Sequence, residues 1–327
     1  MRHNPFPALR PAATQTLPGN DHFEPSHHLW GREEIDALTL AFAARRPLLV
    51  RGEAGVGKSQ IARAAAAVMY AGPPLVEVIH PRFEALELLY RFDAVARLSD
   101  AQVKDANGQS LLDATNARYV GPGGLWRAFA LGRQSKKPQV LLIDEIDKAD
   151  ADLPNALLDV LGNRSFSVPH LKNAQQVVHR VQAQPEHMPL IVITTNEERE
   201  LPAAFVRRCV VLNLAPPEDE AGFAQWLCQR ARVHPNLAEL DDTVLRTAAA
   251  QVWKDRCEAD GAGFPKVGLA EYIDLLVALH ELTAASPRGE RTAQQLHWLQ
   301  RLSAYALVKN AKQDQARAPV EPLAATP

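Results

Sequence analysis

One eight-residue segment constrains the fold of this chain more than any other feature. It consists of Gly52, Glu53, Ala54, Gly55, Val56, Gly57, Lys58 and Ser59, and it matches the phosphate-binding pattern G-x-x-x-x-G-K-[ST] at every specified position. In such a loop the backbone N–H groups point at phosphate oxygens, and the following helix adds the positive end of its dipole. The lysine supplies charge to the β- and γ-phosphates, and the serine hydroxyl binds Mg²⁺. The segment therefore predicts a site for a nucleoside triphosphate and Mg²⁺.

The residues on either side of the loop have the pattern that the motif requires. Residues 47–50 are apolar and predict a buried strand, whereas residues 60–69 are rich in alanine and predict a helix. Strand, glycine-containing loop and helix thus follow one another in the expected order. We include Gln60, the first residue of that helix, in the predicted nucleotide site.

Short apolar runs alternate with helical patterns through the first two thirds of the chain. The runs are rich in Val, Ile and Leu without alternating polar residues, which is typical of parallel strands covered on both faces. We therefore predict an α/β nucleotide-binding domain over residues 29–215, built on a five-stranded parallel sheet. The candidate strands are residues 47–51, 74–79, 139–143, 189–194 and 209–213.

The pattern changes to helices alone after Pro216 and Pro217, which predicts a small helical domain over residues 216–310. Residues 1–28 are rich in proline and lack periodicity, so we expect an irregular arm, either disordered or clasping a neighbour. We expect residues 311–327 to form a flexible tail. The candidate helices of the helical domain are residues 218–232, 241–254, 268–280 and 291–309.

Charge, cysteine content and hydropathy narrow the possible partners of the protein and its cellular compartment. The formal net charge of −2 provides no general attraction to nucleic acid or anionic membranes. Cys209, Cys228 and Cys257 are widely spaced and form no C-x-x-C motif, which is typical of reduced cysteines in a cytosolic protein. No apolar run reaches the roughly 18 residues that a membrane span requires, and the first residues lack the apolar core of a signal peptide. We expect a cytoplasmic protein without a membrane span.

Polar residues follow two of the candidate strands and suggest hydrolysis. Asp144 ends an apolar strand, where its carboxylate can reach Mg²⁺ through water, and Glu145 can polarise the water that attacks the γ-phosphate. Asn196 follows the strand at 189–194, where its amide can orient that water, although an Asn there is also a common turn former. Together these residues predict catalysis rather than binding alone.

Two long spacers interrupt the α/β pattern. Residues 81–137 form an insertion between the second and third candidate strands, and they contain a glycine-rich turn at 121–124. Residues 166–168 and 177–181 are short β-like runs that can pair as a hairpin ahead of Asn196. Such loops either face a partner or are ordinary surface loops.

These residues carry a resemblance to the AAA+ ATPases, and within them to the MoxR-like group. The similarity covers about residues 25–285. Residues 52–59 resemble Walker A, residues 141–145 resemble Walker B, and Asn196 resembles sensor 1. Residues 201–209 resemble the stretch that carries the arginine finger, and Trp30 and Gly31 resemble the element that packs on the adenine ring.

The resemblance implies an ATP-hydrolysing ring, with six subunits, that uses ATP and Mg²⁺ to remodel a client protein, in that group often one with a von Willebrand factor A domain. Arg207 and Arg208 lie before the last strand, far from their own nucleotide, so they can reach only the nucleotide of a neighbouring subunit. We favour Arg208 as the arginine finger, with Arg207 as the second candidate. A basic pair capping a helix is the alternative.

One departure from the family pattern concerns the lid. The family places an arginine, sensor 2, at the start of the third lid helix, and this sequence has Lys266 there. Lys266 can act as a cation near the γ-phosphate, but lysine lacks the bidentate geometry of arginine, and a solvated lysine ahead of a helix is the favoured alternative. Two other functions stay open: a regulatory nucleotide switch with slow turnover, and a DNA-directed motor, which the acidic charge balance disfavours.

Overall fold

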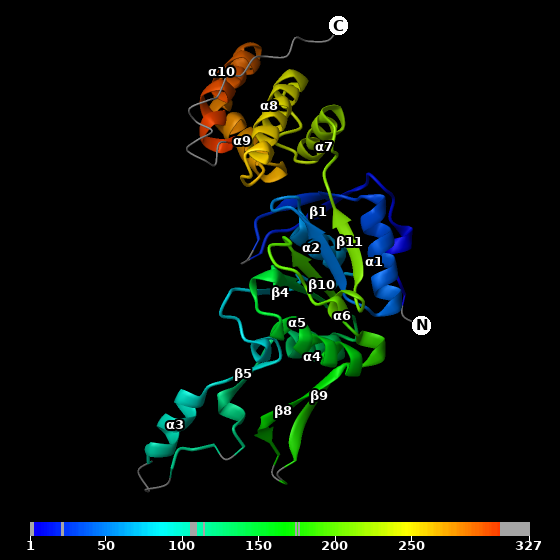
Figure 1. Ribbon diagram of the computed structural model, residues 1–327, viewed down its shortest axis with the longest axis vertical. Helices are drawn as coiled ribbons and strands as arrows, with labels where there is room; N and C mark the ends of the chain where they lie inside the picture. Colours follow the sequence, from blue (N-terminus) through cyan, green and yellow to red (C-terminus); the bar gives the residue numbers. More distant parts are fainter. Residues whose placement is uncertain are drawn as a thin grey trace. The chain divides into compact units, whose positions relative to one another are not determined.

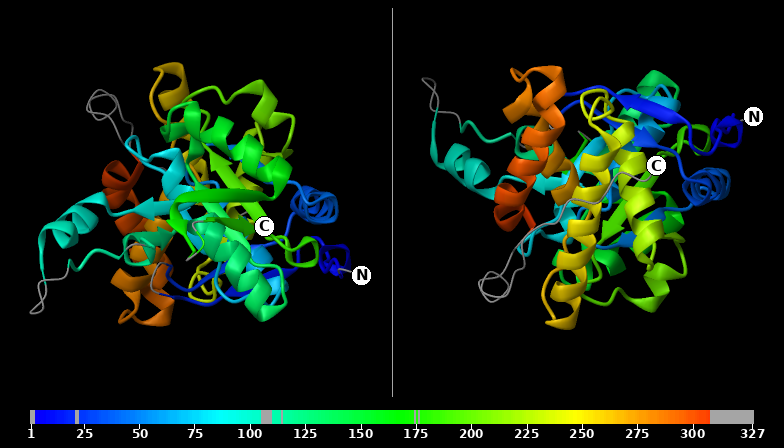
Figure 2. Two further views of the ribbon diagram at one scale, coloured as in Figure 1. Left: turned by 90° about the horizontal axis from the view of Figure 1, so that it is seen from below. Right: turned by 90° about the horizontal axis from the view of Figure 1, so that it is seen from above.

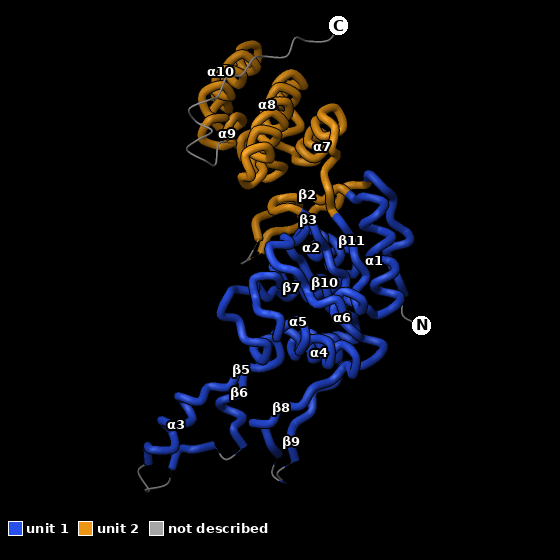
Figure 3. Tube along the Cα trace, viewed as in Figure 1, with its two compact units in different colours: residues 1–12, 30–52, 58–213 blue, residues 13–29, 53–57, 214–327 orange. Residues whose placement is uncertain are grey.

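The computed structural model describes residues 3–20, 23–104, 110–113, 115–173, 175 and 177–307. The chain divides into two compact units, shown in Figure 3. The first contains residues 1–12, 30–52 and 58–213, and the second contains residues 13–29, 53–57 and 214–327. The expected flexible tail at 311–327 lies outside the described residues. Among the described residues, no helix is long and apolar enough to cross a membrane.

A five-stranded parallel sheet forms the centre of the first unit, as the apolar runs predict (Figure 1). Its strand order is β11-β3-β10-β7-β4, so β3 and β7 lie on either side of β10. Every residue of β10 is buried, which explains why its sequence shows no alternation. The strands are β3 (Leu48–Gly52), β4 (Leu75–Val78), β7 (Val140–Asp144), β10 (Leu190–Thr195) and β11 (Val210–Leu214).

Helices between these strands complete the α/β core. The helix α2 packs on β3, β7 and β10, and α4 packs on β4 and β7. Because α4 belongs to this core, the insertion predicted at residues 81–137 is shorter than expected and ends before α4. The helices are α1 (Arg32–Ala44), α2 (Lys58–Val68), α4 (Gly124–Ser135), α5 (Asp152–Asn163) and α6 (Ala203–Val206).

The insertion extends away from the sheet, as Figures 1 and 2 show from three directions. Its strands β5 (Tyr90–Phe92) and β6 (Val120–Pro122) pair in antiparallel fashion and carry α3 (Ala94–Gln102) between them. No residue of α3, all of which are described, is buried. A turn of 3-10 helix at Ala85–Leu88 precedes β5, and another at Ala117–Tyr119 precedes β6.

The hairpin predicted before Asn196 is confirmed. The strands β8 (Ser165–Lys172) and β9 (Val178–Gln182) pair in antiparallel fashion, with Phe166 opposite Val181. His170 of β8 stacks on Phe92 of the insertion with ring centroids 4.1 Å apart. The two loops that interrupt the α/β pattern therefore contact each other.

Among its described residues the second unit has four helices, and all of them contribute to its buried core. They are α7 (Glu220–Arg232), α8 (Asp242–Gly261), α9 (Leu269–Thr283) and α10 (Arg288–Leu307). The same unit includes an antiparallel hairpin of β1 (Thr14–Leu17) and β2 (Ser26–Leu29). The described residues between 3 and 28 are therefore less irregular than their proline content suggests, and in the first unit the Phe6 side chain of a 3-10 turn (Phe6–Ala8) is fully buried.

Candidate nucleotide-binding site

The glycine-containing loop connects the end of β3 to the start of α2. Gly55 and Gly57 adopt φ angles of 78° and 96°, which side-chain-bearing residues rarely adopt, so the loop depends on glycine at both positions. Gly55 also lies so close to Ala270 that an added Cβ would approach the Ala270 methyl to 2.9 Å. At the end of the loop, the Lys58 ammonium donates to the carbonyl of Gly52 over 2.7 Å. The local structure thus matches the one that the motif predicts.

Ser59 and Asp144 lie together at the carboxyl edge of the sheet, as the sequence predicts. The Ser59 hydroxyl donates to the two carboxylate oxygens of Asp144 over 2.8 and 3.0 Å. Thr194, on the neighbouring strand β10, donates its hydroxyl to Asp144 Oδ1 over 2.5 Å and accepts a hydrogen bond from the backbone N–H of Glu145. Sequence reasoning missed Thr194, which orients both carboxylate residues. The sequence signal that could have identified Thr194 was its position in the strand β10, two residues before Asn196.

Glu145 and Asn196 also converge, and Lys58 joins them. The Lys58 ammonium donates to Asn196 Oδ1 over 2.7 Å, and Asn196 Nδ2 lies 3.4 Å from Glu145 Oε1. The three predicted residues come from α2, from the residue after β7 and from the residue after β10. One amide therefore contacts both the lysine of the loop and the candidate general base.

A buried carboxylate that sequence reasoning missed fixes the turn that carries Asn196. Asp147 is 1% exposed, and its Oδ2 accepts the backbone N–H groups of Asn196 and Glu198 over 3.1 and 3.0 Å. It lies in a 3-10 turn (Ile146–Lys148) that follows Glu145. Its only sequence signal was that it is the third carboxylate in the segment 144–147. Asp147 therefore positions Asn196 through the backbone.

Lys148 forms an ion pair with the candidate base. Its ammonium lies 3.0 Å from Glu145 Oε2, and both side chains are about one-third exposed. The hydrogen bond to Glu145, together with the charge of that carboxylate, raises the pKa of the Lys148 ammonium above its ordinary value. Lys148 therefore stays charged across the physiological pH range and keeps one Glu145 oxygen engaged.

The oxygen atoms around Ser59 suit a hard divalent cation. Mg²⁺ prefers oxygen ligands and is commonly held by one or two carboxylates together with substrate phosphates and water. Ser59 and Asp144 supply a hydroxyl and a carboxylate at one place, which fits that preference. Within the described part of the chain, no cluster of three or more His, Cys, Asp or Glu side chains could hold a metal ion by itself.

Inside the second unit, Glu53 of the loop contacts two cations. Arg256 Nη2 lies 2.7 Å from Glu53 Oε2, and Lys266 Nζ lies 4.0 Å from Glu53 Oε1. Lys266 itself forms a closer ion pair with Asp260, at 2.7 Å. Arg256, which the sequence did not single out because it is 203 residues from Glu53, therefore makes the shorter contact with the loop.

The remaining candidates for the nucleotide site lie at the start of α1 and in α2. Gly31 is the N-cap of α1, and its N–H donates to Glu34 Oε2 over 2.9 Å. Trp30 is 2% exposed, so its indole ring is covered. Gln60 is partly buried in the first turn of α2.

The structure distinguishes the two candidate finger arginines. Arg46 donates to the backbone carbonyls of both Arg207 and Arg208. The Arg208 guanidinium donates to the carbonyl of Leu158 over 2.6 Å, so it is engaged within its own chain. The Arg207 side chain instead lines a pocket of about 540 Å³ next to Thr195.

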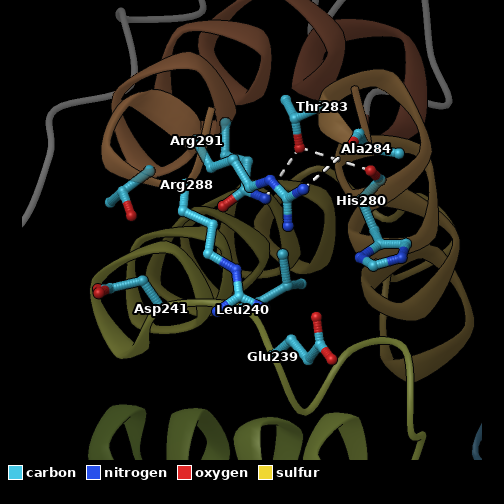
Figure 4. A pocket seen from close by; sticks show the side chains of 10 residues that line it. Glu239, Leu240, Asp241, His280, Thr283, Ala284, Arg288 and Arg291 are labelled. Carbon is cyan, nitrogen blue, oxygen red and sulfur yellow. Dashed lines mark hydrogen bonds between the residues drawn. The ribbon is translucent and has the colours of Figure 1, made fainter. Parts of the chain in front are cut away.

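A separate pocket of about 420 Å³ in the second unit is lined by residues 239–241, which precede α8, and by residues of α9, of α10 and of the turn between them (Figure 4). Arg291 donates to the carbonyls of Ala284 and Ser286, which closes the turn between α9 and α10. Arg288 extends across the pocket, whose lining also includes the carboxylates of Glu239 and Asp241. Since the formal charges of these side chains balance, the pocket has no preference for an anion.

Comparison with known proteins identifies the first unit. Residues 47–209 match the model of the AAA domain (dynein-related subfamily). No curated protein matches the chain. Similar solved structures include NtrX from Brucella abortus in complex with ATP, at 16% identity and a TM-score of 0.40, covering 74% of this chain and 48% of that chain. NtrX from the same organism in complex with ADP matches at 15% identity and a TM-score of 0.41, covering 77% of this chain and 51% of that chain.

The chain thus spans about half the length of these NtrX structures. The matched segment 47–209 contains Lys58, Ser59, Asp144, Glu145 and Asn196, whose side chains meet at one edge of the sheet. This chain therefore carries the nucleotide-binding domain of an AAA+ ATPase.

Proposed function

We propose that this protein hydrolyses ATP in a ring of identical subunits and uses the energy to remodel a partner protein. The observation that carries the proposal is the hydrogen-bonded set of Lys58, Asn196 and Glu145 beside the Ser59–Asp144 pair. A site for binding alone requires the phosphate loop but not a carboxylate and an amide aimed at the same place.

The residues have distinct roles in the proposed reaction. The loop N–H groups and Lys58 hold the phosphates, and Lys58 compensates their negative charge. Glu145 accepts a proton from the attacking water, and Asn196 orients that water, so both act on the same molecule. Ser59 and Asp144 would hold Mg²⁺, which when bound supplies positive charge to the phosphate oxygens.

We propose that an arginine from the neighbouring subunit completes the site. Both Arg207 and Arg208 belong to the segment that resembles the finger, and we now favour Arg207, since the Arg208 guanidinium is bound to the Leu158 carbonyl. An arginine supplied in trans typically contributes about 10³–10⁵ in rate. The subunits must then meet through unlike surfaces, as in a closed ring, for which we propose six members.

Mixing two inactive variants tests this arrangement. Arg207→Ala retains its phosphate loop, and Lys58→Ala retains its arginines, so a mixed ring contains interfaces with every catalytic group. We expect each variant alone to be inactive and the mixture to regain part of the wild-type ATPase rate. A mixture with Arg208→Ala in place of Arg207→Ala is the matched comparison. No recovery in either mixture would contradict the intersubunit site.

A regulatory switch with slow turnover is the second candidate, and one observation favours it. Lys148 holds Glu145 Oε2 in an ion pair at 3.0 Å, so this oxygen is already engaged and is not free to contact the attacking water. If the pair persists with ATP bound, the protein would assemble on ATP and hydrolyse it slowly. A steady-state ATPase rate equal to that of Glu145→Gln would support the switch over the remodelling machine.

We further propose that the client is a protein with a von Willebrand factor A domain, that the ring works in the cytoplasm, and that Lys266 or Trp30 contributes to the nucleotide site. The MoxR-like sequence pattern supports these assignments. A pull-down with Glu145→Gln and ATP tests the client, because that variant should retain ATP and hold the ring on its partner.

A DNA-directed motor would instead show DNA-stimulated ATPase activity that declines with salt.

A further inference from the structure

A second pocket lies at the opposite edge of the sheet from the nucleotide site. It has a volume of about 780 Å³, and its lining residues precede the strands rather than follow them. Residues 68–70 precede β4, residues 136–138 precede β7, and residues 186–187 precede β10. Lys58, Asp144 and Asn196 are at or beyond the carboxyl ends of the same parallel sheet. The pocket is therefore distinct from the nucleotide site.

The pocket combines an apolar wall with an excess of positive charge. Phe42, Val68, Met69 and Pro138 supply the apolar surface. Three basic side chains, Arg45, Lys136 and Lys137, line the same pocket together with one carboxylate, Glu186. Across the part of the chain that the structure describes, no salt bridge joins any of these three cations to a carboxylate. Among the described lining residues, three cations thus accompany one carboxylate.

Three helices end at this pocket with residues that are unusual for their backbone conformation. Arg45 after α1, Tyr70 after α2 and Lys136 after α4 have φ angles of 55°, 50° and 55°. Glycine is the usual residue at such a helix end, because other residues adopt the left-handed conformation at a cost in free energy. Each of the three instead places a long side chain at the pocket, and the Tyr70 side chain is 82% exposed.

Helix geometry alone explains only part of this arrangement. Cations near helix C-termini are stabilised by the helix dipole, which accounts for the charge of Arg45 and Lys136. The helix dipole explains neither the presence of Tyr70 at such a position nor the apolar wall that these side chains border.

We propose that this pocket binds a small amphipathic anion, a carboxylate attached to an apolar body. The volume falls within the range of pockets that hold small organic ligands, and such pockets are mostly apolar with a few polar groups that fix the orientation. Arg45, Lys136 and Lys137 hold the carboxylate, and Phe42 and its apolar neighbours cover the body of the ligand. Neither an inorganic anion nor an uncharged apolar molecule satisfies both halves of the pocket.

Calorimetry with three probes tests the proposal on the full chain. We use 4-phenylbutyrate, which has the charge and the apolar body, 4-phenylbutanol, which has only the body, and acetate, which has only the charge. We expect 4-phenylbutyrate to bind at least about tenfold more tightly than either of the others. Equal binding of 4-phenylbutanol, or no binding of 4-phenylbutyrate, would overturn the proposal.

Glycine substitutions locate the site without unfolding the protein. The double variant Arg45→Gly, Lys136→Gly loses two cations, so we expect it to bind 4-phenylbutyrate about tenfold more weakly. Glycine adopts the left-handed conformation of both positions without strain, so we expect an unchanged or raised Tm. Arg164→Gly is the matched control, because Arg164 caps α5 with a φ of 53° and does not line the pocket. Unchanged affinity in the double variant, or an equal loss in Arg164→Gly, would place the binding elsewhere.

Discussion

Asp147 offers a quantitative test of how the catalytic edge is held together. Its carboxylate is buried and accepts two backbone hydrogen bonds from the turn that carries Asn196. Hydrogen bonds to a charged partner each contribute about 1.5–3 kcal/mol. Glu198 is exposed, so water can replace one of the two bonds after substitution. We therefore expect Asp147→Ala to lower the free energy of unfolding by about 1.5–3 kcal/mol, the contribution of the other bond.

Urea unfolding measures this loss, and Asp150→Ala is the matched control. Asp150 is three residues away, its side chain is 84% exposed, and its ion pair with Arg199 is on the surface, so its removal should cost less than about 1 kcal/mol. The ATPase rate of Asp147→Ala should fall as well, since Asn196 is then no longer held against Lys58 and Glu145. Equal stability and equal ATPase rates in the two variants would refute the positioning role of Asp147.

Two further predictions concern single side chains. Removing the Lys148 cation in Lys148→Met frees Glu145, so we expect the steady-state ATPase rate to rise severalfold; a lower rate would mean that the ion pair assists catalysis. Burial raises the pKa of the Cys209 thiol to about 12, so Cys209 stays protonated and unreactive up to about pH 9, whereas Cys257 is exposed. Alkylation of the native protein followed by mass spectrometry should modify Cys257 first, and equal modification of Cys209 would contradict its burial.

The sequence predicted the sheet well because buried parallel strands have a strong pattern. All five strands begin and end within about two residues of the predicted bounds, since each apolar run is bordered by polar or proline residues. The helix α8 runs on to Gly261, beyond the predicted end at residue 254, because Asp255 and Ala259 are buried in the core of the helical unit despite the polar sequence around them. The N-terminal hairpin was missed because its strands have only four residues each and lie between prolines.

The phosphate loop and the residues at the strand ends could be found in the sequence because parallel strands bring their carboxyl ends together. Ser59 and Asp144 are 85 residues apart, yet Asp144 ends one strand of the sheet and Ser59 follows another through the phosphate loop. Contacts that do not follow from such a rule could not be predicted from the sequence. The pairing of Glu53 with Arg256 depends on how the helical unit folds around residues 53–57, and the pocket at the other edge of the sheet depends on how three helices end.

The most direct test of the central claim compares ATP hydrolysis and ATP binding in Glu145→Gln. Removing the general base while keeping the side-chain shape should lower the steady-state ATPase rate by about 10²-fold or more. ATP affinity should stay within a few-fold of the wild type, because Lys58 and the loop are unchanged. Wild-type turnover as slow as that of Glu145→Gln, with ATP bound equally in both, would contradict the account of this edge as a catalytic site.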